Sequence, residues 1–121
     1  MTSKNYMFIR YINKGVVIYP KIYYHDITHI QSDKDYCKIF SSRKIYQIHI
    51  TLERFLSCLP ADIFCRCHRQ FIVNIDRIEQ IEDKTIVFEG YTVPISDRYK
   101  NEFIKNINLL PSTYVSKKQS I

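Results

Sequence analysis

Residues 64–74 hold the side chains best suited to binding a charged partner. The segment reads Phe-Cys-Arg-Cys-His-Arg-Gln-Phe-Ile-Val-Asn, with apolar anchors around its polar positions and no acidic residue. Its hydrogen-bonding side chains are Arg66, His68, Arg69, Gln70 and Asn74. Side chains of these types donate hydrogen bonds to phosphate oxygens and to base edges. The composition therefore predicts a packed element that presents hydrogen-bond donors to an acidic polymer.

The distribution of charge points to a basic face. The chain has a formal net charge of +6 and a pI near 9.2. Such basicity fits nucleic acid, an anionic membrane or no specific partner. Residues 36–52 and 63–75 contain no Asp or Glu, although Lys38, Arg43 and Lys44 lie in the first of these windows. The two windows indicate a basic face, and ordinary solvated surface charge is the alternative interpretation.

The sequence lacks the motifs of catalysis. Its only glycines are Gly15 and Gly90, so it has no glycine-rich phosphate loop, and no Ser, Cys or His lies in a recognisable nucleophile motif. His25, His29 and His49 fit ordinary surface or core histidines. We therefore expect neither enzymatic activity nor a cofactor.

The cysteine pattern does not indicate a metal site or a disulfide framework. Cys37, Cys58, Cys65 and Cys67 include no CxxC pair, and we expect all four to be reduced. A zinc site at Cys65, Cys67 and His68 would require these side chains to converge. On a strand, however, Cys67 and His68 point to opposite faces.

Short runs of alternating apolar and polar residues predict a mainly β protein with antiparallel hairpins. Tyr and Phe number 10 and 7, and with the many Ile they fit a pleated, half-buried surface. Breaks of turn composition lie at residues 13–15, 41–43, 82–84 and 89–90. The predicted strands are residues 6–12, 16–22, 27–32, 36–40, 45–50, 64–67, 79–81, 85–88 and 91–95.

Two short helices complete the predicted fold. Thr51 is placed to cap a helix through Leu59, and Ser96 to cap a second through Leu110, with Pro60 and Pro111 as stops. At 121 residues we expect one domain over residues 1–110 and a mobile polar tail over 111–121. No apolar run approaches the ~20 residues that span a bilayer, and no signal-peptide core follows the first residues. We expect a cytoplasmic protein that does not bind membranes.

The pattern Phe-x-Arg-x-His-Arg-x-Phe-Ile-Val-Asn, followed by Ile78 and Ile81, resembles the core motif of the LytTR DNA-binding domain family. This family occurs in bacterial transcription regulators of the two-component type. The resemblance runs from about Tyr6 to Leu110 and includes Lys34-Asp35-Tyr36 after the second strand and Arg98-Tyr99 after Val-Pro-Ile-Ser at 93–96. Gln70 stands where many members have Ser, and Asp97 where many have a basic residue.

The resemblance implies an elongated antiparallel β domain that places loops into two successive major grooves. It implies base contacts by Tyr36, Arg69 and Arg98, although Tyr36 fits packing at a strand edge equally well. We assign contacts with backbone phosphates, which position a protein without reading sequence, to Lys34, Lys38, Arg43, Gln70 and Lys100. Structural support is expected from Arg66, His68 and Asn74: Arg66 by holding carbonyl groups of the motif or an acid such as Asp62, His68 by orienting a neighbour and Asn74 by capping the turn that leads to Asp76.

The function that follows is sequence-specific binding of double-stranded DNA in bacterial transcription regulation. We expect a pair of copies on repeated promoter half-sites. The chain would act either as the output domain of a response regulator, with a receiver domain in a histidine kinase pathway, or as a free-standing regulator. The alternative is a β-rich protein-interaction module whose aromatic side chains bind a partner without DNA specificity.

Chelation should leave both the fold and any DNA affinity intact, because Cys67 and His68 diverge. Circular dichroism before and after chelator treatment, with zinc analysis of the purified protein, measures this. Stoichiometric zinc together with unfolding on chelation would contradict the expectation.

Overall fold

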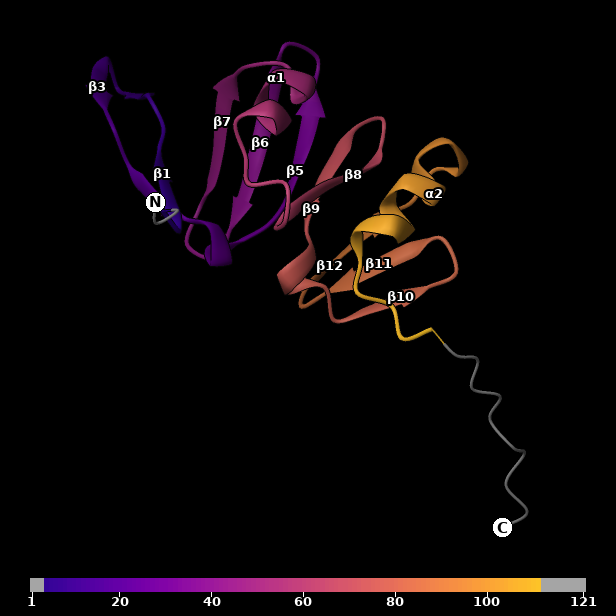
Figure 1. Cartoon of the computed structure of the whole chain (residues 1–121). Coiled ribbons are helices and arrows are strands. Elements are labelled where there is room, and N and C mark those ends of the chain that lie inside the picture. The colour runs from indigo at the N-terminus through magenta and orange to yellow at the C-terminus, as the bar shows by residue number, and fades with distance from the viewer. Residues whose placement is uncertain (1–3, 112–121) are drawn as a thin grey trace.

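The computed structural model describes residues 4–111, which form small antiparallel β-sheets and two α-helices (Figure 1). The helices are α1 (Leu52–Ser57) and α2 (Asp97–Asn106), and two 3-10 turns are η1 (Tyr24–Asp26) and η2 (Ile75–Arg77). The strands are β1 (Tyr6–Phe8), β2 (Tyr11–Asn13), β3 (Val16–Ile18), β4 (Lys21–Tyr23), β5 (Ile27–Asp33), β6 (Tyr36–Ser41), β7 (Ile45–His49), β8 (Phe64–His68), β9 (Phe71–Asn74), β10 (Gln80–Glu82), β11 (Thr85–Phe88) and β12 (Tyr91–Pro94). The prediction of a mainly β, antiparallel fold with two short helices is confirmed.

A five-stranded sheet in the order β7-β6-β5-β9-β8 forms the centre of the molecule. Strand β9 pairs with β5 on one side and with β8 on the other. The predicted strands did not include β9. Its residues Ile72, Val73 and Asn74 are all buried, so the segment shows no alternation of apolar and polar positions. A strand covered on both faces reads as a continuous apolar run, which periodicity alone does not identify.

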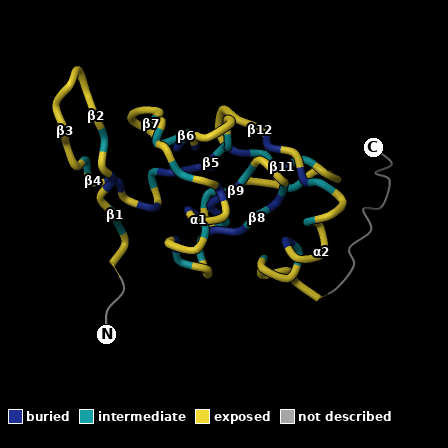
Figure 2. The backbone as a smooth tube through the Cα atoms, turned by 90° about the horizontal axis from the view of Figure 1, so that it is seen from above, coloured by how far each residue is buried: buried dark blue, intermediate teal, exposed yellow. Residues whose placement is uncertain are grey.

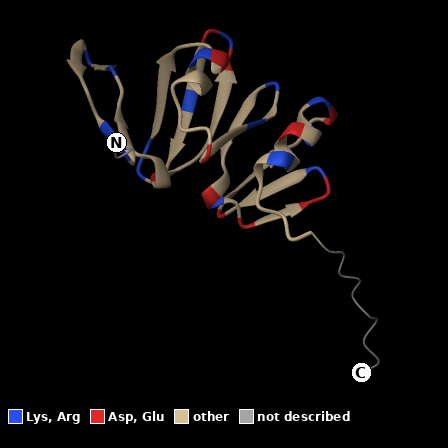
Figure 3. Ribbon diagram, viewed as in Figure 1, with Lys and Arg blue, Asp and Glu red and all other residues tan. Residues whose placement is uncertain are grey.

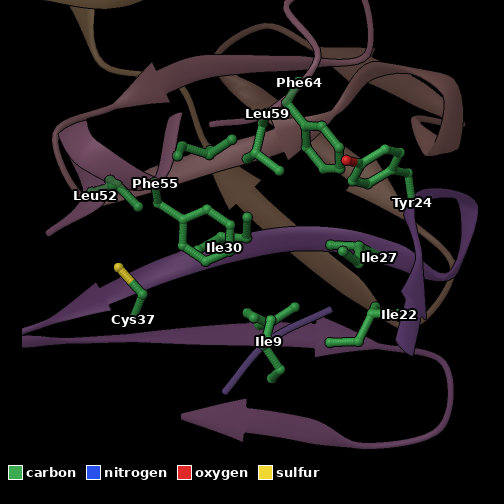
Figure 4. Packing of buried hydrophobic residues seen from close by; sticks show 12 residues of the cluster. Ile9, Ile22, Tyr24, Ile27, Ile30, Cys37, Leu52, Phe55, Leu59 and Phe64 are labelled. Atoms are coloured by element: carbon green, nitrogen blue, oxygen red, sulfur yellow. The ribbon is translucent and has the colours of Figure 1, made fainter. Parts of the chain in front are cut away.

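The central sheet separates two hydrophobic cores. In the first core, Ile30 of β5 lies beside Phe55 of α1, while Ile27 of β5 lies toward Tyr24 and Ile22 (Figure 4). The rings of Tyr24 and Phe64 meet edge to face there, with their centroids 5.7 Å apart. Edge-to-face geometry is favourable for aromatic pairs.

The second core lies under α2 and the three-stranded sheet β10-β11-β12. Phe103 of α2 is fully buried with Val93 of β12 and Cys67 of β8. Along β9, Ile72 belongs to the first core and the next residue, Val73, to the second. The period of two along a strand thus lets a single strand support both cores.

Helix α1 agrees closely with its prediction. The Thr51 hydroxyl accepts a hydrogen bond from the Arg54 N–H at 3.2 Å, which is the expected N-cap. The helix ends at Ser57, two residues before the predicted end at Leu59.

Helix α2 differs from its prediction at both ends. Ser96 occupies the N-cap position, but its side chain makes no capping hydrogen bond within residues 4–111. The helix stops at Asn106 because the backbone of Ile107 is extended, with ψ of 150°, so the predicted end at Leu110 is wrong. Leu110 is 76% exposed, so among residues 4–111 it gains little packing that would extend the helix. Residues 112–121 of the predicted polar tail lie outside the described residues.

The N-terminal strands are shorter than predicted, because each predicted strand is divided in two. Ile9 donates a hydrogen bond to the Pro20 carbonyl at 3.1 Å, but proline has no N–H to return. Beyond this break, β2 and β3 form a hairpin that projects from the body and is exposed along most of its length (Figures 1 and 2). Its turn uses Lys14 at φ 51° and Gly15 at φ 80°. Positive φ at both turn residues matches the twist of a tight hairpin.

His29 is buried in an aromatic environment between the central sheet and the second core. Its ring stacks on Phe40 at 4.2 Å between centroids and lies 5.8 Å from the ring of Phe88. Thr28 Oγ1 is 2.8 Å from His29 Nδ1. Burial lowers the pKa of His29 to about 4, because the charged imidazolium loses its hydration there.

This depressed pKa makes stability depend on pH in a definite direction. Between pH 6.5 and 4 the unfolded chain binds more protons at His29 than the folded chain does, so acidification through this window lowers the free energy of unfolding. The full effect is about 3 kcal/mol and is complete below pH 4. Denaturant unfolding of wild type and His29→Phe across this window measures it. Parallel pH curves for the two proteins would contradict the assignment.

Candidate nucleic-acid interface

Two turns meet at one end of the central sheet. The β5–β6 turn carries Lys34, and the β8–β9 turn carries Arg69 and Gln70. The Ser32 N–H donates to the Gln70 carbonyl at 2.9 Å, which joins the two turns directly. Both turns lie along the upper edge in Figure 1. The antiparallel topology therefore brings side chains 35 positions apart in sequence to the same edge.

Arg66 and His68 hold the β8–β9 turn in shape. Arg66 Nε donates to the His68 carbonyl at 2.9 Å, and a terminal guanidinium nitrogen donates to the Arg69 carbonyl. The Gln70 N–H donates to His68 Nδ1 at 3.0 Å, which requires the tautomer with its proton on Nε2. A β-bulge between Arg66 and His68 shifts the register just before the turn. The exposed side chain of Arg69 thus projects from a backbone fixed by three side-chain hydrogen bonds.

Tyr36 and Lys38 continue this edge along β6. Tyr36 is 43% exposed, and its ring meets that of His49 on β7 edge to face at 5.3 Å. Lys38 Nζ lies 3.7 Å from a carboxylate oxygen of Asp33. Tyr36 therefore packs on one neighbour and also presents a face to solvent.

The start of α2 forms a third segment beside the β8–β9 turn. The Ser96 N–H donates to the Cys67 carbonyl at 3.0 Å, which ties the helix start to β8. Arg98 and Lys100 are exposed in the first turns of the helix. The Arg66 guanidinium lies 5.2 Å from the centroid of the Tyr99 ring, so α2 and the β8–β9 turn also touch through side chains.

Asp97 is paired with a residue that the sequence did not single out. Lys84 Nζ in the β10–β11 turn lies 2.7 Å from Asp97 Oδ1. The hydrogen bond to Lys84 and its positive charge lower the pKa of Asp97. Lys84 lies in a segment read only as a hairpin tip, and no local pattern joins it to residue 97. Basic and acidic residues thus lie close together at the β10–β11 turn and the start of α2, whereas the β8–β9 turn has no acidic residue (Figure 3).

Asn74 and Arg43 lie away from this edge. The Asn74 carboxamide is fully buried at the far end of β9, where it donates to the carbonyls of Tyr24 and Ile27 and accepts from the Asp76 N–H, each at 2.9 Å. Arg43 occupies the β6–β7 turn, and the adjacent Ser42 N–H donates to the Asp26 carbonyl. That turn lies at the opposite end of the sheet from Arg69. The structure therefore groups the predicted contact residues except Arg43.

The cysteines are thiols, and the buried ones are poorly ionised. Burial raises the pKa of the Cys65 thiol to about 11 and that of Cys67 to about 12. Within residues 4–111, no group of three His, Cys, Asp or Glu side chains is placed to hold a metal ion. Nor is any helix in this part of the chain long and apolar enough to cross a membrane.

The geometry defines an antiparallel β domain that presents arginines from turns and a helix start at one edge. The family model of the LytTr DNA-binding domain matches residues 19–108. The chain belongs to the LytTR DNA-binding domain family. A solved structure of similar fold is a LytTr DNA-binding domain of a putative methyl-accepting/DNA response regulator from Bacillus cereus, with a TM-score of 0.72 and 23% identity over 88% of this chain and 100% of that one.

Similar curated proteins are bacterial regulators. The sensory transduction protein LytT of Enterococcus faecalis is 30% identical over 90 residues, which are 69% of this chain. The transcriptional regulatory protein YpdB of Escherichia coli K12 is 28% identical over 92 residues, or 70% of this chain. The chain spans only 37% of the length of LytT and 38% of that of YpdB.

Proposed function

We propose that this chain binds double-stranded DNA sequence-specifically in bacterial transcription regulation. The observation that carries the proposal is the β8–β9 turn, where Arg66 and His68 fix the backbone from which Arg69 projects. An arginine on a backbone that is already ordered can pair with O6 and N7 of guanine in the major groove without a cost for ordering the turn. Membership in a DNA-binding family supports the same conclusion.

Within this proposal the contact residues fall into two groups. Arg69, Arg98 and Tyr36 read base edges from the β8–β9 turn, α2 and β6. Phosphate contacts come from Lys34, Lys38, Gln70 and Lys100, which flank these positions. Arg43 would require DNA to reach the opposite end of the sheet, so we leave it out of the interface.

The longer relatives suggest how the domain is used. LytT and YpdB extend well beyond the region shared with this chain. We propose that the chain has no chemistry of its own and acts in the cytoplasm. It would serve either as the output domain of a receiver-containing regulator in a histidine kinase pathway or as a free-standing regulator.

One observation favours the alternative of a protein-interaction module. The β2–β3 hairpin and the residue after it expose Ile12, Val16 and Tyr19 at 57%, 60% and 62%. Contiguous exposed apolar side chains are typical of protein contacts. The two functions differ in salt dependence, because each phosphate contact adds about −0.9 to the slope of log K against log salt, whereas apolar contacts add almost nothing.

Removing a base-reading arginine should reduce the preference of the protein for its selected duplex over random DNA. We expect Arg69→Ala or Arg98→Ala to cost about 1–3 kcal/mol on a duplex selected from a random pool, and much less on random DNA. Lys100→Ala should weaken both duplexes alike and flatten the salt slope by roughly one unit. Titrations at several salt concentrations measure these effects. Arg43→Ala is the matched control. It should change neither the affinity for the two duplexes nor the salt slope.

The arginine prediction fails if either variant loses specific and non-specific affinity equally. In that case Arg69 and Arg98 would belong with the phosphate contacts. Equal affinity of the wild type for selected and scrambled duplexes would reject the proposed function itself.

Two copies are expected to bind repeated half-sites, because one small domain covers limited DNA surface. Half-sites about one helical turn apart, or a small multiple of that spacing, place both copies on the same face of the duplex. Inserting about five base pairs rotates one site by half a turn and should abolish cooperative binding. Gel-shift titrations on both duplexes provide the measurement. Unchanged cooperativity would reject this geometry.

A further inference from the structure

Tyr99 contacts two arginines that belong to different parts of the interface. Its ring centroid lies 5.2 Å from the Arg66 guanidinium carbon and 5.4 Å from that of Arg98. The side chain of Tyr99 is half-buried, while Arg98 is exposed. A cation near an aromatic ring at this distance is attracted by the ring's quadrupole. The ring therefore restricts an arginine side chain that would otherwise be free to move in solvent.

The two arginines act at different places. Arg98 projects from the first turn of α2, whereas Arg66 donates to the carbonyls of His68 and Arg69 and so shapes the β8–β9 turn. The backbone hydrogen bond from Ser96 to Cys67 joins the same two segments. Tyr99 adds a side-chain contact between these two segments. Its ring lies near Arg98 and also near Arg66, which holds the backbone of Arg69.

We propose that Tyr99 is a positioning residue for base reading, which orients Arg98 directly and Arg69 through Arg66. The inference rests on the proposed function. Tyr99 itself need not touch DNA. Its role is to set the spacing of the two arginines before the duplex arrives, so that little side-chain freedom is lost on binding.

The test compares Tyr99→Phe, which keeps the ring, with Tyr99→Leu, which removes it. We expect Tyr99→Leu to lose about tenfold in affinity for the selected duplex and less than about twofold for random DNA. Tyr99→Phe should bind like the wild type. In an Arg98→Ala background, Tyr99→Leu should cost less than it does alone, because one of the two arginines that it orients is already gone.

Tyr46→Leu is the matched control. Tyr46 is also a half-buried tyrosine, and its ring centroid lies 5.2 Å from Lys44 Nζ, but it belongs to β7 at the end of the sheet near Arg43. This variant should leave DNA discrimination unchanged. Thermal unfolding of all variants tests whether the fold is kept.

Arg66→Lys provides a second test that does not alter the tyrosine. Lysine keeps the positive charge but cannot reproduce the forked donation to two carbonyls while lying against a ring. The Arg66→Lys variant should therefore show a weaker preference among base pairs at the position that Arg69 reads. If Tyr99→Leu fails to fold, Tyr99→Met, which also removes the ring, takes its place in the comparison with Tyr99→Phe.

Three results would overturn the inference while leaving the proposed function in place. They are wild-type discrimination by folded Tyr99→Leu, equal loss on selected and random duplexes, and a loss in Tyr99→Phe as large as that in Tyr99→Leu. The last would indicate that the hydroxyl group contacts DNA. A wild-type protein without sequence preference would instead reject the proposed function.

Discussion

The double-sided burial of β9 is the constraint on which the rest of the structure depends. Ile72 packs into one core and Val73 into the other, so this one strand contributes to both cores. At its end, the Asn74 carboxamide makes three hydrogen bonds to backbone groups of other segments. Because buried polar groups are stabilising only when they are satisfied, these bonds also fix where the strand stops.

The position of the candidate interface follows from this arrangement. With β9 held between β5 and β8, the turn before it must lie beside the β5–β6 turn, as the hydrogen bond from Ser32 to Gln70 shows. The second core brings α2 against β8 and so places Arg98 next to the same turn. A surface assembled from three separate segments is therefore anchored to both the central sheet and the second core.

Local patterns in the sequence predicted much of this fold. Alternation located most strands, turn composition located the hairpin tips, and Thr51 identified the start of α1. What failed depends on contacts between distant residues. β9 lacks alternation because both of its faces are covered. In the described part of the chain Leu110 stays exposed, so it adds little packing that would extend α2. The pairing of Lys84 with Asp97, the contacts of Tyr99 and the location of Arg43 likewise depend on topology, which a single sequence does not display.

The ion pairs at this edge affect how strongly the protein would bind DNA of unrelated sequence elsewhere in a genome. Lys38 lies near Asp33, and Lys84 pairs with Asp97, so part of the positive charge is balanced within the protein. A lysine that already has a carboxylate partner gains less from displacing counterions on DNA of arbitrary sequence. For a regulator that must find a few sites among millions of others, a low affinity for the background leaves more of the protein available to its targets.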